Sequence, residues 1–361
     1  MSRLQGGPIH PPGPKPQTPP ETRLSRRERR LRQSPPAFSH RRQLRWITFG
    51  IFVCLTGLLA LLLFLAPVQQ EPVARATIPT AEPRLSAPEP PTPEAVATDL
   101  RGELEQVAQQ YPASYGVIVS DPSSGETVEM NPNQSFLAAS LTKLPTLLTL
   151  YSAAARGEVD LDAPITMTAS DVQAYGTGVL YLEPVGTTMT LRECAELMIK
   201  ESDNTAWVML HRYMGRSNIE AELYEMGARS TAYWVPNTTT AHDVHVMLEA
   251  IADPSYTSPE LSAEMLSFMT DTSFEDRLPQ PLPEEARVAH KIGSYGDTFS
   301  DAGLVFPEGS QDVEHAYYII VIAGDTTEYT ARSAMQEMSL ATYESLSGTS
   351  PTPASGPSTT Q

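Results

Sequence analysis

Ser140 and Lys143, three residues apart in the segment Ser-Leu-Thr-Lys, are residue types that can carry out nucleophilic chemistry together. The following apolar residues predict a helix over Ser140–Arg156, and a spacing of three brings two side chains to one helix face. A serine hydroxyl needs a base within hydrogen-bond reach. A lysine that is desolvated near another cation can lose its proton and act as that base. A solvated lysine on a helix surface is the alternative for this motif alone.

Two further short motifs could complete such a site. Ser202-Asp-Asn204 follows a predicted helix; its hydroxyl could relay a proton to a leaving nitrogen, and its amide could hold a substrate. A helix N-cap is the alternative, because all three residue types are favoured there. Lys291-Ile-Gly293 lies on a predicted strand, where a cation can face a carboxylate and a glycine lets a substrate chain come close to the strand edge.

The elements that must position these motifs are two strands and a helix early, helices in the middle, and three strands and a helix late. This order indicates an α/β (α+β) fold with an antiparallel sheet and a separate helical lobe. Two helix starts have the spacing of a capping box, Thr190–Glu193 and Ser217–Glu220. The predicted helices are Glu94–Tyr111, Ser140–Arg156, Thr190 to about Lys200, Ser217 to Gly227, one from Thr240, and Tyr329–Ser345; the predicted strands are Ser114–Ser120, Glu126–Met130, Arg287–Ser294, Asp301–Phe306 and His315–Ala323.

The three motifs, in this order, resemble those of the penicillin-recognising serine hydrolases, and within them the class A β-lactamase-like family. The resemblance covers essentially residues 96–346. It implies a five-stranded antiparallel sheet flanked by helices, beside an all-helical lobe, with the nucleophile at their junction. The segments that carry it are Phe136-Leu-Ala-Ala-Ser-Leu-Thr-Lys143, Ser202-Asp-Asn-Thr-Ala206, His290-Lys-Ile-Gly293 and Asp301-Ala-Gly-Leu-Val305.

The same resemblance implies a serine acyl-hydrolase that acts on β-lactams or D-Ala-D-Ala-type peptides through an acyl-enzyme. A nucleophile, a base and a proton relay would form the catalytic group, and backbone N–H groups would stabilise the oxyanion. The implied catalytic residues are Ser140, Lys143 and Ser202, and the implied substrate-binding residues are Asn204, Lys291, Gly293 and Ser294, with the N–H groups of Ser140 and Ser294 as the oxyanion hole.

The sequence departs from the family pattern at two places. Hydrolytic class A enzymes carry a glutamate that activates the deacylating water, whereas Tyr233–Thr240 contains no carboxylate. Glu220, just upstream, is predicted to cap a helix, and Glu222 and Glu225 to lie on a solvated face. Ile292 replaces a hydroxyl residue that would help to hold a substrate carboxylate. We therefore expect slow deacylation, and a catalytically weak protein that binds penicillin or cell-wall fragments is the alternative.

The charge of the chain is unevenly distributed. Residues 1–46 carry eleven Lys and Arg against two Glu, so the rest has a net charge of −27 in a chain whose total is −18. A polyanionic body repels phosphate backbones, which argues against nucleic acid as a partner. The basic segment is rich in Pro, Arg and Ser and is expected to be disordered. A membrane-tethered interaction protein, acting through this tail, is a third interpretation.

Ile47–Val68 contains 22 residues without a charge, enough to cross a hydrocarbon core of about 30 Å. The arginines directly before it predict a cytoplasmic N-terminus and an extracytoplasmic domain, and so a single-pass cell-membrane protein. A cleaved signal peptide is the alternative. Residues 69–95 contain seven prolines and are expected to be an extended spacer. The domain then covers 96–346, and 347–361 form a disordered tail.

No cofactor or metal is expected. His242 and His290 lack neighbours with metal-ligand spacing, and the chain contains no Gly-rich phosphate loop. One of the two cysteines, Cys54, falls in the predicted span, which leaves Cys194 without an intrachain partner. The domain must therefore be held together by its core alone.

Overall fold

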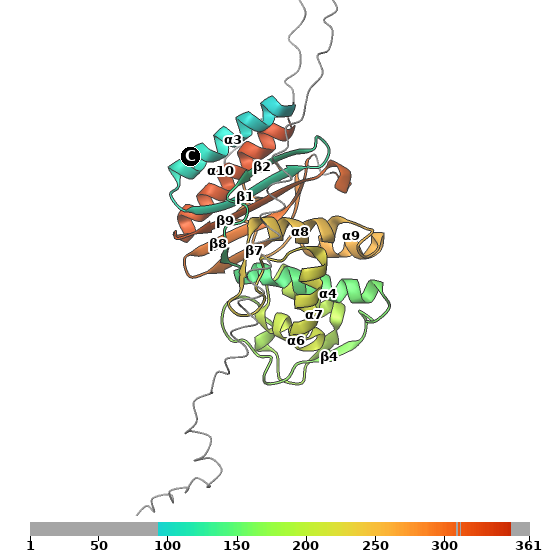
Figure 1. Cartoon of the computed structure of the whole chain (residues 1–361). Helices are drawn as coiled ribbons and strands as arrows, with labels where there is room; N and C mark the ends of the chain where they lie inside the picture. The colour runs from blue at the N-terminus through green and yellow to red at the C-terminus, as the bar shows by residue number, and fades with distance from the viewer. Residues whose placement is uncertain (1–92, 308–309, 311, 348–361) are drawn as a thin grey trace, which may run out of the picture. The chain divides into compact units, whose positions relative to one another are not determined.

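The computed structural model of the protein describes residues 93–347 apart from 308–309 and 311 (Figure 1). The predicted basic tail, the predicted span Ile47–Val68, nearly all of the predicted linker and the C-terminal tail lie outside the described residues. Within the described part, no helix is both long enough and apolar enough to cross a membrane. The domain that the sequence predicts over 96–346 falls within the described residues.

Five antiparallel strands form the central sheet in the order β2-β1-β9-β8-β7. Strand β9 lies between β1 and β8, so early and late parts of the chain pair in the middle of the sheet. The prediction of a five-stranded antiparallel sheet is confirmed. The bounds are β1 Ser114–Asp121, β2 Glu126–Met130, β7 Arg287–Tyr295, β8 Thr298–Phe306 and β9 Tyr317–Gly324.

Helices cover both faces of this sheet (Figure 1). Helices α3 and α10 lie side by side on one face, and α8 packs on the other. Alternate strand residues point to opposite faces, so Ile319 of β9 lies in the core under α3 and α10, and Ile320 in the core shared with the helical lobe. Burial on both faces explains why β9 is a continuous apolar run. The bounds are α3 Pro93–Gln110, α8 Ala241–Ala252 and α10 Glu328–Ser347.

The second lobe is helical and packs around α4, in which every residue from 143 to 153 is buried. A helix that is apolar all round is expected in such a position, and Lys143 at its first residue is the charged exception. The remaining elements of the described chain are η1 Ala139–Thr142, α4 Lys143–Ala155, η2 Leu180–Leu182, α5 Leu191–Lys200, α6 Asn204–Met214, α7 Arg216–Met226, α9 Pro259–Phe268 and, between β8 and β9, η4 Val313–His315, with short ribbons of β3 Phe136–Leu137 with β6 Thr238–Thr239 and of β4 Pro164–Thr166 with β5 Thr188–Thr190.

The helix predicted from Ser140 begins with a tighter turn. Residues Ala139–Thr142 form the 3-10 helix η1, and the α-helix begins only at Lys143. Ala139 has a φ of +48°, in the left-handed region that a non-glycine residue rarely occupies. This break sets Ser140 at a bend in the chain rather than inside a regular helix.

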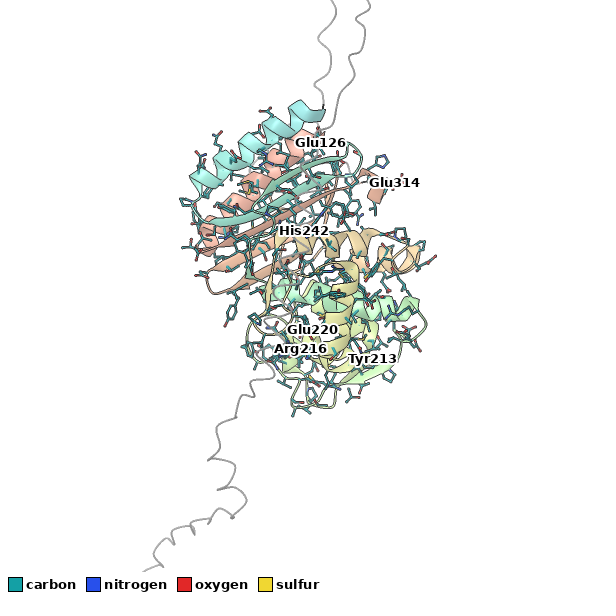
Figure 2. The ribbon with its side chains drawn as sticks, in the orientation of Figure 1. Glu126, Tyr213, Arg216, Glu220, His242 and Glu314 are labelled. Atoms are coloured by element: carbon teal, nitrogen blue, oxygen red, sulfur yellow. The ribbon has the colours of Figure 1, made fainter. Side chains whose placement is uncertain are left out.

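One predicted cap is confirmed and the other is wrong. Thr190 and Glu193 form the reciprocal capping box at the start of α5. Helix α7 instead begins directly after Gly215, and Glu220 accepts a hydrogen bond of 2.7 Å from Arg216 on the surface of the helical lobe (Figure 2). A surface ion pair one turn apart has replaced the cap there.

Two strands begin at different residues from those predicted. Strand β8 begins at Thr298 rather than at Asp301, because residues 298–300 pair with residues 293–295 at the end of β7. Strand β9 begins at Tyr317 rather than at His315, because the chain first forms η4, where the Asp312 side chain accepts a hydrogen bond from the N–H of Glu314.

Candidate active site

Ser140 lies where the helical lobe meets the edge strand β7 of the sheet. A Cβ atom on Gly293 of β7 would come within 3.0 Å of the Ala138 carbonyl oxygen and 2.5 Å of Ser300 Oγ. Glycine is therefore required at this position so that the strand can lie against the turn that carries Ser140. Asn237 holds the same turn from the other side, because its carbonyl oxygen accepts a hydrogen bond of 2.9 Å from the N–H of Ala138.

Lys143 lies within hydrogen-bond reach of Ser140 and is a residue type that can act as a base. Its Nζ lies 3.0 Å from Ser140 Oγ, 2.6 Å from the Ser202 carbonyl oxygen and 2.8 Å from Asn204 Oδ1. The Asn204 amide is oriented by a hydrogen bond of 3.1 Å from its Nδ2 to the Tyr175 carbonyl oxygen. A neutral amine has two N–H groups, and these two pure acceptors use both of them. The nitrogen lone pair is then left for the two hydroxyl groups that lie 3.0 Å away, those of Ser140 and Ser202.

Ser202 joins the two buried lysines of the site. Its Oγ lies 3.0 Å from Lys143 Nζ and accepts a hydrogen bond of 2.9 Å from Lys291 Nζ. Ser202 has a φ of +49°, and a strained backbone of this kind persists only where the surroundings hold it in place. The hydroxyl can therefore pass a proton between the base and a leaving group in the cleft.

Burial controls the charge of both lysines. Lys143 is 1% and Lys291 is 2% exposed. Desolvation, with the charge of Lys291, lowers the pKa of Lys143 well below its ordinary value. Desolvation also lowers the pKa of Lys291 to about 7, although the carboxylate of Asp301 acts in the opposite direction. Both shifts favour the neutral amine, which is the form of a lysine that can act as a base.

Asp203 holds one wall of the cleft in place. One carboxylate oxygen caps α6 by accepting from the N–H of Ala206, and the other accepts from the N–H groups of Val179 and Leu180 at 2.7 and 2.8 Å. A Cβ on Gly178 would lie 2.3 Å from that carboxylate, so only glycine fits. The N-cap interpretation of this motif is therefore confirmed for Asp203, and the functional interpretation of Ser202 and Asn204 stays a prediction.

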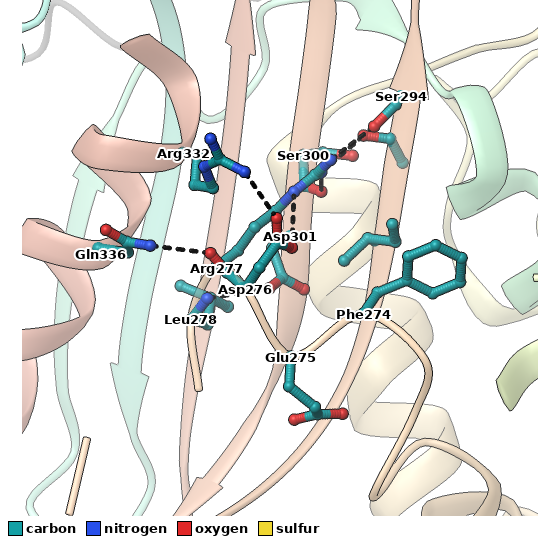
Figure 3. Close-up of polar contacts among 12 residues, drawn as sticks. Phe274, Glu275, Asp276, Arg277, Leu278, Ser294, Ser300, Asp301, Arg332 and Gln336 are labelled. Atoms are coloured by element: carbon teal, nitrogen blue, oxygen red, sulfur yellow. Dashed lines mark hydrogen bonds and ion pairs between the residues drawn. The ribbon is translucent and has the colours of Figure 1, made fainter. Parts of the chain in front are cut away.

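Sequence reasoning missed Arg277, which lies in the loop between α9 and β7. Its guanidinium donates hydrogen bonds of 2.9 Å to the Gly293 carbonyl oxygen, 2.6 Å to the Ser300 carbonyl oxygen and 2.6 Å to Ser294 Oγ (Figure 3). Arg277 lines the cleft, as do Ser294 and Ile292, whereas Lys291 lies behind Ser202 and is not part of the lining. No periodic pattern marks a loop arginine, so the sequence offers no signal for it.

The loop 231–240 closes the other side of the cleft without a carboxylate. Trp234 has a φ of +77° and stacks on His211 with ring centroids 3.8 Å apart. Trp234, Pro236 and Asn237 line the cleft. Val235, which is joined to Pro236 by a cis peptide bond, is 68% exposed. The aromatic packing therefore fixes this loop beside Ser140.

The three upstream glutamates do not line the cleft. The prediction that Glu222 lies on a solvated face is wrong: it is 5% exposed and accepts a hydrogen bond of 2.5 Å from Tyr256 Oη. Glu225 is exposed as predicted. His290 is fully buried between Asp301 and Glu275, with its nitrogens 2.8 and 3.2 Å from their carboxylates.

The cleft has a volume of about 600 Å³, which is the size of a small-ligand site. It is lined by Ser140, Lys143 and Ser202, together with Arg277 and the exposed rim residues Tyr175 and Tyr295. A larger cavity of about 1040 Å³ lies beside α8 and α9 but contains none of these groups. In the described part of the chain, no three His, Cys, Asp or Glu side chains are grouped as metal ligands.

A model of the β-lactamase enzyme family matches residues 99–346 of the chain. The chain belongs to this family. The resemblance to class A β-lactamase-like serine hydrolases is thereby confirmed, and with it the serine-hydrolase character of the domain.

Relatives within the β-lactamase family are distant but cover the domain. The β-lactamase of Bacillus licheniformis is 26% identical over 227 residues, or 58% of this chain and 72% of that protein. β-Lactamase 1 of Bacillus cereus is 27% identical over 229 residues, or 58% and 73%. The structure of PBP-A is 26% identical with a TM-score of 0.64, covering 70% of this chain and 97% of PBP-A. A PBP-A mutant, solved as an acyl-enzyme complex with penicillin G, has a TM-score of 0.65 at the same identity and coverage.

Proposed function

We propose that the domain is a serine acyl-hydrolase that forms an acyl-enzyme on Ser140 with β-lactams or D-Ala-D-Ala-type peptides. The observation that carries the proposal is the environment of Lys143. Its pKa is lowered, two acceptors can take its N–H groups, and its lone pair is left for the hydroxyls of Ser140 and Ser202, each at 3.0 Å. An activated nucleophile needs this arrangement.

In the acylation step, Ser140 Oγ attacks the carbonyl carbon of the amide while its proton moves to Lys143 Nζ. The backbone N–H groups of Ser140 and Ser294 would stabilise the oxyanion. The carbon–nitrogen bond then breaks. Ser202 gives its proton to the leaving nitrogen and takes one from Lys143, which returns the amine to its neutral form. The contacts of Ser202 Oγ with Lys143 and Lys291 support this relay.

Arg277 is the cation best placed to hold a substrate carboxylate. It lines the cleft beside Ser294, and a guanidinium stays charged at every pH of interest. Lys291 is buried behind Ser202 with a pKa of about 7, so its charge is partial at neutral pH. We therefore assign the binding of a substrate carboxylate to Arg277 and Ser294. Lys291 would instead adjust the electrostatic potential around Ser202. Asn204 would contact the substrate amide while it orients Lys143.

Deacylation is proposed to be slow, because the loop 231–240 offers no carboxylate to activate water. General-base catalysis usually supplies about 10²–10⁴-fold, and that factor is missing here. The acyl-enzyme complex of the PBP-A mutant with penicillin G supports the expectation that a protein of this fold can hold such an intermediate.

Burst kinetics with a chromogenic β-lactam test both parts of the proposal. We expect one product per enzyme at once, followed by a slow steady rate. The Ser140→Ala variant should give no burst. Steady turnover above about 10 s⁻¹, an ordinary enzyme rate, would contradict slow deacylation while leaving acylation intact.

The missing carboxylate also favours a second candidate, a protein that binds penicillin or cell-wall fragments with little turnover. The two candidates differ in covalent chemistry. If binding is the function, calorimetry will measure the same affinity for the ligand in the wild type and in Ser140→Ala. A radiolabelled penicillin will then not remain attached to the wild-type protein during denaturing electrophoresis.

We further propose that Ile47–Val68 anchors the protein in the cell membrane with the catalytic domain outside. The charge-free segment and the arginines before it support this topology. In intact cells, external protease should remove the domain and spare an N-terminal tag. A mature chain that starts near Gln69 would show instead that the segment is a cleaved signal.

A further inference from the structure

His290 is a fully buried residue of β7 that no step of the proposed reaction uses. Its Nδ1 lies 2.8 Å from Asp301 Oδ1, and its Nε2 lies 3.2 Å from Glu275 Oε1. Because an ionised carboxylate only accepts hydrogen bonds, the ring donates from both nitrogens and is an imidazolium. A buried charge is costly unless it is well paired, so this arrangement is more than filling of the core.

The contacts of the ring keep it charged. Desolvation alone would lower the pKa of His290, but the carboxylates of Asp301 and Glu275 raise it to about 9. Burial would raise the pKa of Glu275, but the hydrogen bonds from His290 and Thr272 lower it. At neutral pH a cation therefore joins the two carboxylates.

This buried ion cluster ties a loop to the sheet. Asp301 belongs to β8 and His290 to β7, whereas Glu275 belongs to the loop 269–286, which carries Arg277. Glu275 also shapes the loop locally, because its Oε1 accepts hydrogen bonds of 2.6 and 2.8 Å from the N–H and the hydroxyl of Thr272. The imidazolium therefore holds the loop two residues before Arg277.

The same cluster holds the loop just after Arg277. Asp301 Oδ2 accepts a hydrogen bond of 3.1 Å from the N–H of Leu278. His290 orients this carboxylate, since the ring takes the other oxygen, Oδ1. Figure 3 shows Arg277 between Glu275 and Leu278, with Asp301 beside them. Both neighbours of the guanidinium along the chain thus depend on His290.

Helix α10 also contacts this loop, but at the surface. Arg332 donates a hydrogen bond of 3.1 Å to the Asp276 carboxylate, and Gln336 donates one of 2.9 Å to the Asp276 carbonyl oxygen (Figure 3). Exposed contacts of this kind contribute little, because water and salt screen them. The buried cluster is therefore the stronger restraint on the loop.

We propose that His290 is a positioning residue, whose imidazolium sets the place of the Arg277 guanidinium and with it the recognition of a substrate carboxylate. The inference rests on the proposed function, which assigns the binding of that carboxylate to Arg277. Without the charge of the ring, the carboxylates of Asp301 and Glu275 would repel each other. The loop would then move away from the sheet and take the guanidinium with it.

Acylation of the full chain by penicillin G and by its methyl ester should be compared in His290→Gln, which keeps a polar side chain and removes the charge. The concentration of penicillin G for half-maximal acylation should rise about 5- to 20-fold, which is part of the effect of deleting the guanidinium itself. The maximal acylation rate, and the acylation efficiency of the ester, should stay within about 2-fold, because only the binding of the carboxylate is weakened.

Glu275→Gln removes the charge at the loop end of the cluster and should give the same carboxylate-specific loss. The double variant should lose no more than His290→Gln, because the repulsion between the two carboxylates is then gone. Tyr256→Phe is the matched control: it deletes a hydrogen bond to another buried carboxylate, that of Glu222, and neither residue lines the cleft. It should change the acylation of neither compound.

Equal losses for penicillin G and its ester in His290→Gln would overturn the inference, as would a fall in the maximal rate. Either result would mean that His290 acts on Lys143 and Lys291 or on the fold as a whole. Losses of His290→Gln and Glu275→Gln that multiply in the double variant would overturn the shared cluster. If His290→Gln does not fold, Glu275→Gln decides, because the Glu275 side chain is 43% exposed.

The outcome also separates this inference from the function on which it rests. If the wild type forms no acyl-enzyme, or if Arg277→Ala shows no carboxylate-specific loss, the proposed function fails and the inference fails with it. If Arg277→Ala shows that loss and His290→Gln does not, the loop keeps its place without the imidazolium, and the inference alone is wrong.

Discussion

Removing the guanidinium of Arg277 should weaken the recognition of a substrate carboxylate specifically. The side chain is 3% exposed and donates to two backbone carbonyl oxygens and to Ser294 Oγ (Figure 3). A hydrogen bond to a charged group contributes about 1.5–3 kcal/mol. At about 1.4 kcal/mol per factor of ten, the concentration for half-maximal acylation should rise about 10- to 150-fold in Arg277→Ala.

The same substitution also removes a donor from the carbonyl oxygens of Gly293 and Ser300, so it should lower the free energy of unfolding by roughly 1–3 kcal/mol. A pair of substrates separates the two effects. A penicillin and its methyl ester differ in the carboxylate and share the reactive amide. Only the penicillin should lose acylation in Arg277→Ala, and Arg277→Lys should recover part of that loss because it keeps the charge.

Equal losses for the penicillin and its ester would refute the assignment. They would mean that Arg277 acts only by holding β7 in place. Thermal unfolding of each variant, followed by circular dichroism, shows whether the folded fraction at the assay temperature is the same as in the wild type.

The remaining expectations concern a base and a buried ion pair. Lys143→Ala should slow acylation by about 100-fold or more without unfolding the domain, as measured by labelling and circular dichroism. His290 is desolvated, but the carboxylates of Asp301 and Glu275 raise its pKa to about 9. The raised pKa of His290 should therefore add about 3 kcal/mol to the free energy of unfolding. This contribution should be complete below pH 6.5 and lost as the pH rises through 9. Urea unfolding at pH 6 and pH 9.5 should show this loss in the wild type and a smaller one in His290→Gln; an equal pH dependence would contradict it. The opposing contribution of Lys291 is present in both proteins and cancels in the comparison.

The sheet and the three motifs could be predicted from sequence because each depends on local patterns. Strands such as Ser114–Asp121 are apolar runs bounded by turn residues, and the Thr190–Glu193 box marks its helix directly. The motif order then identified the family. The start of α4 was harder to predict, since the 3-10 turn η1 before it begins at the left-handed Ala139, beside contacts with Asn237 and β7.

Arg277 and Asn237 could not be predicted for a different reason. Both lie in loops, where no period links a residue to a face, and both act through partners far away in sequence. Glu222 was misjudged on similar grounds, because its burial is set by Tyr256 and Arg156 from other parts of the helical lobe. Long-range packing, not local propensity, decides the environment of such side chains.

Intact-mass analysis of the domain after incubation with a penicillin tests the central claim most directly. We expect a gain of one penicillin mass per chain, located by peptide mapping on the peptide that contains Ser140, and persisting after free penicillin is removed. The Ser140→Ala variant should show no gain. An unmodified wild type, or equal modification of both proteins, would contradict the claim that Ser140 is the nucleophile.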